Sequence, residues 1–404
     1  MFLICIIFAF ALHVRAEPLV SPTWGFRLDL PEGYELAGGD RKNSFSFESS
    51  FGTSLDLIVY TGFPSAALLA EETEKKLSSR GKRNVFFHNN REAVISELNF
   101  LRGNETVSGW ALYLELDAVV SPDGRVSGTE SDYRTYLLAL AYGPQKPELQ
   151  CLHLSVLDSI EGSSLDHLLP GAVTGFFHPG GEWISAKLAN SKETAQFRKN
   201  DAAAAQSVVD REFNVMKLYL ASPLWQEAWK RFYRAVYKDS FERLVHASFM
   251  MERSWNNLFA GSGSTGAGSQ TQWPETRSAE SYAIAARALE WVQGFSYERD
   301  LMGSDFINLV TVAQEGRGDC DSRAMLWAVV LSRANIPSGI MVSREYSHAM
   351  GLADLEGWGA RLPMTDSGGR EIKWLVAETT AKVSLGLIGE TVSEISKWLG
   401  ITFD

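Results

Sequence analysis

The sequence predicts an α+β fold in two parts. We expect an N-terminal α/β sandwich, then helices, then a core in which a cysteine-bearing helix packs on an antiparallel sheet. Between residues 23 and 180, apolar and polar residues mostly alternate, which is typical of half-buried strands. From 192 to 258 the apolar spacing becomes helical. At 404 residues, the chain also exceeds what one hydrophobic core usually organises.

Residues 1–16 are predicted to be a secretory signal peptide. Residues 2–12 are almost wholly apolar, and Val14-Arg15-Ala16 offers small residues at the positions a signal peptidase reads. The run is short for a transmembrane helix, and no second run of membrane length follows. We therefore expect an exported protein, periplasmic or secreted, with no membrane span once the signal is removed.

The charge and the cysteine count exclude several classes of protein. The net charge of −11 disfavours nucleic acids and anionic membranes as partners. Beyond the signal, only Cys151 and Cys320 remain, which is too few for a disulfide scaffold. The two could still pair with each other, and such pairing would make Cys320 a redox-sensing thiol.

Residues 17–185 are expected to form the α/β sandwich. An amphipathic helix is predicted at 65–81, closed by Gly81, and a second at 163–177. The order of strands and helices resembles the PsbP-like fold of small exported and photosystem-associated domains. The runs that predict strands are 25–30, 43–49, 54–60, 92–100, 109–117, 133–143 and 151–158.

The segment 186–274 is predicted to be helical, ending in a Gly/Ser-rich loop at 261–272. Trp225, Trp229, Phe232, Tyr233 and Val236 recur at helical spacing, and we interpret this stripe as core packing.

Residues 275–404 carry the pattern that indicates chemistry. Asp319 is a candidate N-cap, and apolar residues follow Cys320 at steps of three and four until Asn335 ends the helix. Cys320 would then lie in the first turn, where free N–H groups and the helix dipole favour a thiolate. We expect a lowered thiol pKa and a backbone donor for an oxyanion.

A base and an orienting acid follow in chain order. His348 opens a strand-like run, and Glu378 follows the apolar residues of another. Glu378 could hold the imidazole of His348 and fix its tautomer, as the third member of a triad does. Asp354 is the alternative acid.

The residues around this triad resemble the core of the transglutaminase-like superfamily of papain-like cysteine enzymes. The matching segments are "GRGDCDSRAMLWAVVLSRANIPSG", "SHAMGLAD" and "KWLVAETTA", and "ALEWVQGFSYERD" resembles the helix and tyrosine that precede them. The resemblance implies Cys320 as nucleophile, His348 as base and Glu378 as acid. Met350 stands where the family usually has tryptophan, and Glu378 where it more often has aspartate. Gln314 is a candidate oxyanion donor, as glutamine is in papain-like enzymes.

Cys151 and His153 form a second candidate cluster. If 151–158 is a strand, both side chains lie on one face and could form a dyad or bind a metal, but no further ligand has useful spacing. We interpret them as core residues and predict no metal or cofactor.

We therefore expect an exported cysteine-dependent acyl-transfer enzyme acting on a protein or peptide substrate. Hydrolysis of peptide or isopeptide bonds is the first expectation, because bulk water outcompetes dilute amines unless the site excludes it. The alternatives are transglutaminase-type cross-linking and a non-catalytic envelope or secreted binding protein with a silent site.

Overall fold

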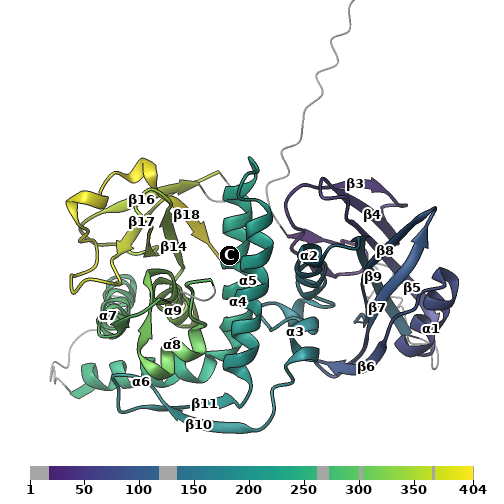
Figure 1. Cartoon of the computed structure of the whole chain (residues 1–404). Helices are drawn as coiled ribbons and strands as arrows, with labels where there is room; N and C mark the ends of the chain where they lie inside the picture. Colours follow the sequence, from purple (N-terminus) through teal and green to yellow (C-terminus); the bar gives the residue numbers. More distant parts are fainter. Residues whose placement is uncertain (1–17, 118–133, 262–272, 300–303, 366–368, 404) are drawn as a thin grey trace, which may run out of the picture.

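The computed structural model describes residues 18–117, 134–261, 273–299, 304–365 and 369–403, with side chains omitted at 257–261 and 273–277. It has the predicted α+β architecture, with one large sheet in each half of the molecule and long helices between them (Figure 1). The signal peptide expected at 1–16 and most of the Gly/Ser-rich loop lie outside the described residues.

The larger sheet has seven antiparallel strands in the order β3-β4-β5-β9-β8-β7-β6. Two of these strands, β3 and β6, are absent from the sequence prediction. The strands are β3 (Tyr34–Gly38), β4 (Ser44–Ser49), β5 (Ser54–Phe63), β6 (Arg83–His88), β7 (Arg91–Arg102), β8 (Glu105–Glu115) and β9 (Arg134–Pro144). A short antiparallel pair, β1 (Leu19–Val20) and β2 (Arg27–Leu28), precedes it.

Helices cover both faces of this sheet, because the strands alternate apolar residues to either side. Helix α1 (Ala66–Leu77) packs on one face through Ala66, Leu69 and Ala70. Helices α2 (Pro147–Asp158) and α3 (Ala172–Phe177) cover the other, which forms a separate core.

The strand prediction for 151–158 is wrong, because these residues belong to α2. Pro147 occupies the first turn, where its fixed φ favours a helix. Leu149, Leu152 and Val156 then recur at helical spacing and enter the core. The apolar residues of 151–158 that suggested a strand lie on the buried face of this helix.

Two helix predictions need correction at their ends. Helix α1 stops at Leu77, because Ser78 takes the left-handed cap conformation at φ 51° before Gly81 is reached. The helix predicted at 163–177 is broken at Pro170 into a 3-10 turn, Ser164–Asp166, and the short helix α3.

The middle of the chain is helical except at its start. A hairpin, β10 (Trp183–Lys187) and β11 (Thr194–Arg198), comes first, so the expected boundary after residue 185 falls within β10. The helices that follow are α4 (Asp201–Leu218), α5 (Trp225–Arg243), α6 (Val245–Gly261) and α7 (Trp273–Gln293).

A buried ionic network joins α5 to the N-terminal half. Arg231 on α5 lies 2.9 Å from Glu212 on α4 and 2.8 Å from Ser155 on α2. One helical turn later, the Arg234 guanidinium donates two hydrogen bonds, of 3.1 and 3.0 Å, to the Asp29 carboxylate. The side chains of Arg231 and Glu212 are only 3% and 2% exposed. Each therefore neutralises the other's charge at a place that water does not reach.

Glu32 lies near this network and is buried without a hydrogen-bond partner on either carboxylate oxygen among the described residues. Burial raises its pKa from 4.5 to about 7, against the opposing charge of Arg231. The folded pKa exceeds the unfolded one, so the protonated form stabilises the fold. That stability is present below pH 4.5 and is lost as the pH rises through about 7.

Glu32→Gln is expected to remove this pH-dependent loss. Relative to the native chain, the variant should gain about 1–3 kcal/mol of unfolding free energy between pH 5 and pH 8. Urea unfolding of both proteins at the two pH values measures the difference. Parallel pH profiles for the two proteins would show that Glu32 does not titrate in the fold.

The smaller sheet has five antiparallel strands in the order β16-β17-β15-β14-β18. The sequence prediction lacks β16 and β18. The strands are β14 (Ser338–Ser343), β15 (His348–Ala353), β16 (Arg361–Thr365), β17 (Glu371–Ala377) and β18 (Leu399–Thr402). Helix α9 (Cys320–Arg333) packs on this sheet, and α8 (Leu309–Glu315) precedes it.

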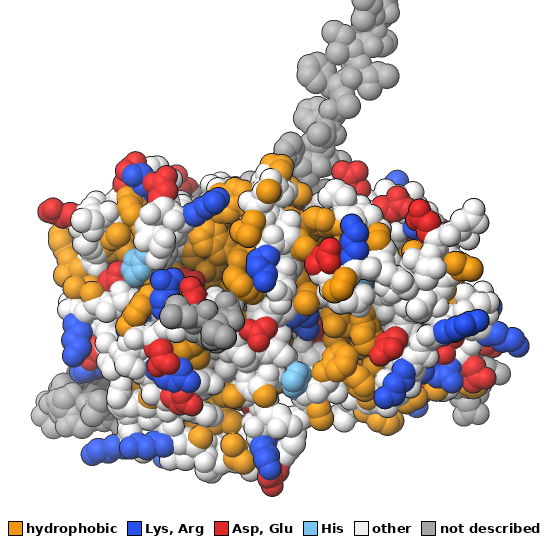
Figure 2. Space-filling view, viewed as in Figure 1, with side chains coloured by type: hydrophobic (Ala, Val, Ile, Leu, Met, Phe, Trp, Pro, Cys, Tyr) orange, Lys and Arg blue, Asp and Glu red, His pale blue; other side chains and the backbone are white. Residues whose placement is uncertain are grey.

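The surface is mixed in charge. On the face shown in Figure 2, basic and acidic side chains are interspersed over both halves of the molecule. Within the described ranges, no helix has the length and apolar character needed to cross a bilayer.

Candidate active site

Helix α9 begins at Cys320, as the sequence predicts. Asp319 is the N-cap, and its carboxylate accepts the N–H of Ser322 at 2.8 Å. At the other end Asn335 has a φ of 58°, the left-handed conformation that terminates a helix. Local cap chemistry therefore fixes the position of the sulfur at the first residue of the helix.

Small residues on β15 let α9 approach the sheet closely. Ala349 and Gly351 are two positions apart on the strand and lie on one face of it. A Cβ at Gly351 would lie 2.4 Å from the indole of Trp327, so only glycine fits there. Cys320 precedes Trp327 by two helical turns and lies over Ala349, whose backbone N–H donates to the sulfur.

His348 and Glu378 are in direct contact. Imidazole Nε2 lies 2.8 Å from Glu378 Oε2, and the other carboxylate oxygen accepts the N–H and hydroxyl of Thr380 at 2.7 and 2.6 Å. Burial opposes ionisation of Glu378, but the bonds from His348 and Thr380 prevail and lower its pKa. Since a carboxylate only accepts, Nε2 carries the proton and Nδ1 is left as the basic nitrogen.

Two buried side chains that the sequence analysis missed hold this arrangement in place. Gln293, at the end of α7, donates to the backbone carbonyls of Glu378 and Val383 at 2.8 and 2.9 Å. Arg323 donates to the carbonyls of Gly318 and Phe295 at 3.1 and 2.9 Å. Arg323 thereby joins the start of α9 to the end of α7.

The expected lowering of the Cys320 pKa is wrong. The side chain is 4% exposed, and burial raises the thiol pKa well above its ordinary range. The neighbouring carboxylates Asp321 and Asp319 raise it further, and the N–H of Ala349 only partly offsets them. Desolvation and two like charges outweigh the helix dipole, so the resting sulfur is a neutral thiol.

The thiol donates to Asp321 Oδ1 at 3.7 Å in this structure. Asp321 in turn accepts from the hydroxyl of Tyr233. The short parallel pair β12 (Ser296–Tyr297) and β13 (Arg317–Gly318) brings the Tyr297 hydroxyl to the sulfur. Among the described residues, no hydrogen bond joins the sulfur to the His348 ring.

Asp321→Asn is expected to make the thiol more reactive. Removing this charge and acceptor lowers the thiol pKa, and a shift of one unit raises the thiolate fraction about tenfold. The rate of Cys320 alkylation by chloroacetamide at pH 8, followed by mass spectrometry, measures the effect. The exposed Asp354→Asn serves as control, and an unchanged or slower rate in Asp321→Asn would contradict the assignment.

The predicted oxyanion donor Gln314 does not join the site. It lies half-buried on α8 and makes no hydrogen bond to Cys320, His348 or Glu378 in the described part of the chain. The backbone N–H groups of Cys320 and Asp321, in the first turn of α9, are the alternative donors, since the N–H of Ser322 is already bonded to the Asp319 cap.

The remaining candidates lie elsewhere. Asp354 is exposed, and Glu378 occupies the position beside His348. Burial lowers the pKa of His153 to about 4, which makes it a neutral core residue of α2. Cys151 and Cys320 are both free and belong to different cores. The residues described contain no group of three or more side chains suited to hold a metal.

Comparisons with known proteins give weak similarities. No protein-family model matches the chain, and no curated protein matches it. The solved structure of CyanoP, a PsbP protein of Synechocystis, is 10% identical and covers 38% of this chain and 95% of its own, with a TM-score of 0.28. A Bacteroides thetaiotaomicron protein is 11% identical over 57% of this chain and 78% of its own, with a TM-score of 0.25.

A third similar structure is a protein from Parabacteroides distasonis described as a candidate protease. It is 9% identical and covers 82% of this chain and 68% of its own, with a TM-score of 0.20. TM-scores this low do not establish a shared fold.

Proposed function

We propose that the protein is an exported cysteine-dependent acyl-transfer enzyme that acts on peptide or isopeptide amide bonds. The observation that supports it best is the 2.8 Å contact of His348 Nε2 with Glu378, on a strand whose next residue hydrogen-bonds the Cys320 sulfur. The transglutaminase-like pattern of the sequence provides the same three roles. In this proposal Glu378 fixes the tautomer of His348, and that tautomer leaves Nδ1 as the base. Strand β15 places His348 near the nucleophile Cys320.

The chemistry begins from a neutral thiol. Cys320 leaves the Asp321 carboxylate, gives its proton to His348 Nδ1 and attacks the substrate carbonyl, so that a C–S bond forms. The oxyanion lies against the N–H groups at the start of α9. His348 returns the proton to the leaving amine as the C–N bond breaks, which leaves a thioester on Cys320.

Water then attacks the thioester as His348 takes one of its protons. The C–O bond forms, the C–S bond breaks, and His348 returns the proton to the Cys320 sulfur as the carboxylic acid leaves. An amine in place of water gives a cross-linked product. Hydrolysis is proposed first because water is far more concentrated than any dilute amine.

A second candidate, a binding protein with a silent site, is favoured by one observation. Cys320 is only 4% exposed, and its thiol is neutral at rest. A substrate therefore reaches the sulfur only if the residues that bury it move. The two candidates differ in what Cys320→Ala does.

Turnover of a panel of fluorogenic peptide amides distinguishes them. The enzyme predicts release of the fluorophore that Cys320→Ala abolishes and Cys151→Ala leaves intact. Release that survives Cys320→Ala would contradict the proposed mechanism. Partner binding without turnover, unchanged by Cys320→Ala, would favour the binding protein.

A further inference from the structure

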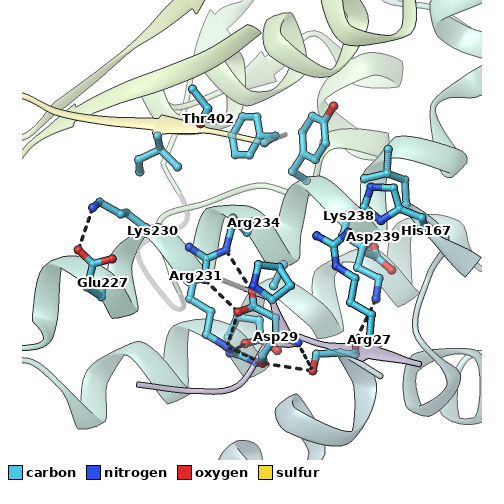
Figure 3. Close-up of a pocket in the computed structure, with 18 of the residues that line it drawn as sticks. Arg27, Asp29, His167, Glu227, Lys230, Arg231, Arg234, Lys238, Asp239 and Thr402 are labelled. Atoms are coloured by element: carbon cyan, nitrogen blue, oxygen red, sulfur yellow. Dashed lines mark hydrogen bonds and ion pairs between the residues drawn. The ribbon is translucent and has the colours of Figure 1, made fainter. Parts of the chain in front are cut away.

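A large cavity lies between α5, the N-terminal segment with β2, and the C-terminal strands β16–β18 (Figure 3). Its volume is about 820 Å³, within the range of roughly 300–1,000 Å³ that small-molecule pockets occupy. Pockets of this kind occur preferentially where two parts of a chain meet. Neither Cys320 nor His348 lines it, so it is separate from the candidate active site.

One wall of the cavity is apolar. It is formed by side chains of the smaller sheet and of the C-terminal segment: Met364, Ile372, Trp374, Ile401 and Phe403. Phe403 stacks on Tyr237 of α5 with ring centroids 4.2 Å apart, and both rings line the cavity. An apolar ligand in the cavity would bury its surface against this wall and away from water, which favours binding.

The facing wall is a row of cations on α5. Lys230, Arg234 and Lys238 recur every four residues, so they lie on one face of the helix. Figure 3 shows them between the strand that carries Thr402 and the segment that carries Asp29. Their side chains are 28%, 19% and 20% exposed, which leaves each of them partly open to a ligand.

Each cation of the row has one carboxylate partner, and among the described residues the unpaired cation of the cavity is Arg27. Lys230 pairs with Glu227 at 2.8 Å, Arg234 with Asp29 at 3.0 Å, and Lys238 with Glu161 at 2.9 Å. Arg27 also lines the cavity and forms no ion pair within the described residues. The other carboxylates of the lining are held by buried arginines: Asp158 by Arg211, Glu212 by Arg231 and Asp239 by Arg243.

We infer that this cavity binds a small amphiphile with a single negative charge. Its anionic group lies against Arg27 and the α5 cations that share the cavity, and its apolar body lies against the wall of β16–β18. A polyanion is disfavoured because the three carboxylates among the cations repel additional charge. A neutral apolar molecule leaves Arg27 without a counter-charge.

Titration calorimetry of the whole protein with decanoate tests the inference. We expect one decanoate per chain, with decyltrimethylammonium and decanol binding at least tenfold more weakly. Lys230→Gln and Arg27→Gln should each weaken decanoate binding at least fivefold without changing the near-UV circular dichroism. Lys199→Gln, which removes an exposed lysine from an equivalent pair with Glu182, should leave it unchanged.

Three results would overturn the inference. They are no decanoate binding at millimolar concentration, equal binding of the cationic and anionic probes, and an equal loss of affinity in Lys199→Gln. The cavity inference does not rest on the acyl-transfer proposal, since the readout is binding and uses no residue of the Cys320 site.

Discussion

His348→Ala is expected to lower the rate of acyl transfer at Cys320 by about 10²–10⁴-fold, the usual contribution of a positioned general base. The effect is large because the thiol pKa is raised by burial and by Asp321, so almost no thiolate exists without a base. Turnover of the best peptide amide from the panel measures it. His246→Ala, which removes an exposed histidine of α6, serves as control.

Glu378→Gln should reduce the same rate by a smaller factor. The amide can still contact Nε2 but supplies no charge for the imidazolium that forms. If His348→Ala changes turnover no more than His246→Ala does, His348 is not the base. A normal rate in Glu378→Gln would remove Glu378 from the mechanism and leave the other two residues in place.

Arg231→Met is expected to lower the free energy of unfolding by about 3–5 kcal/mol, as removal of one partner from a buried ion pair does. Without Arg231, the carboxylate of Glu212 remains 2% exposed with one cation fewer. The backbone carbonyl of Asp29 loses both bonds from the guanidinium and keeps only the bond from the Ser159 hydroxyl. Chemical denaturation measures the change. Lys199→Met, in an exposed pair, should shift stability by less than about 1 kcal/mol.

The double variant Arg231→Met, Glu212→Leu distinguishes two causes of this stability loss: the unpaired buried carboxylate of Glu212, and the lost packing contacts of the Arg231 side chain. With both charges gone, part of the lost stability should return, since Arg211 loses Glu212 as a partner but keeps Asp158. A double variant no more stable than Arg231→Met would show that the guanidinium acts through its shape and its contacts to α2 instead.

Local patterns predict the parts of this site that depend on neighbouring residues. Asp319 caps α9 and Asn335 ends it through their own side-chain and backbone chemistry. The strands that begin at His348 and end before Glu378 follow from their apolar runs. These signals lie within a few residues of the feature they predict.

The parts that were missed depend on segments distant in the chain. The thiol pKa of Cys320 is set by how deeply the folded chain buries it, which a helix start does not reveal. Gln293 supports Glu378 from 85 residues away, and Arg323 contacts Phe295 from 28. The cavity draws its lining from five separate stretches, so no single motif in the sequence indicates it.

Acetylation by p-nitrophenyl acetate tests most directly whether His348 activates Cys320. At pH 7.5 we predict a stoichiometric burst of nitrophenolate, one acetyl group located on Cys320 by peptide mass spectrometry, and a rate at least a hundredfold lower in His348→Ala. Acetyl groups on Cys151 as readily as on Cys320, or an acetylation rate that His348→Ala leaves unchanged, would contradict the account.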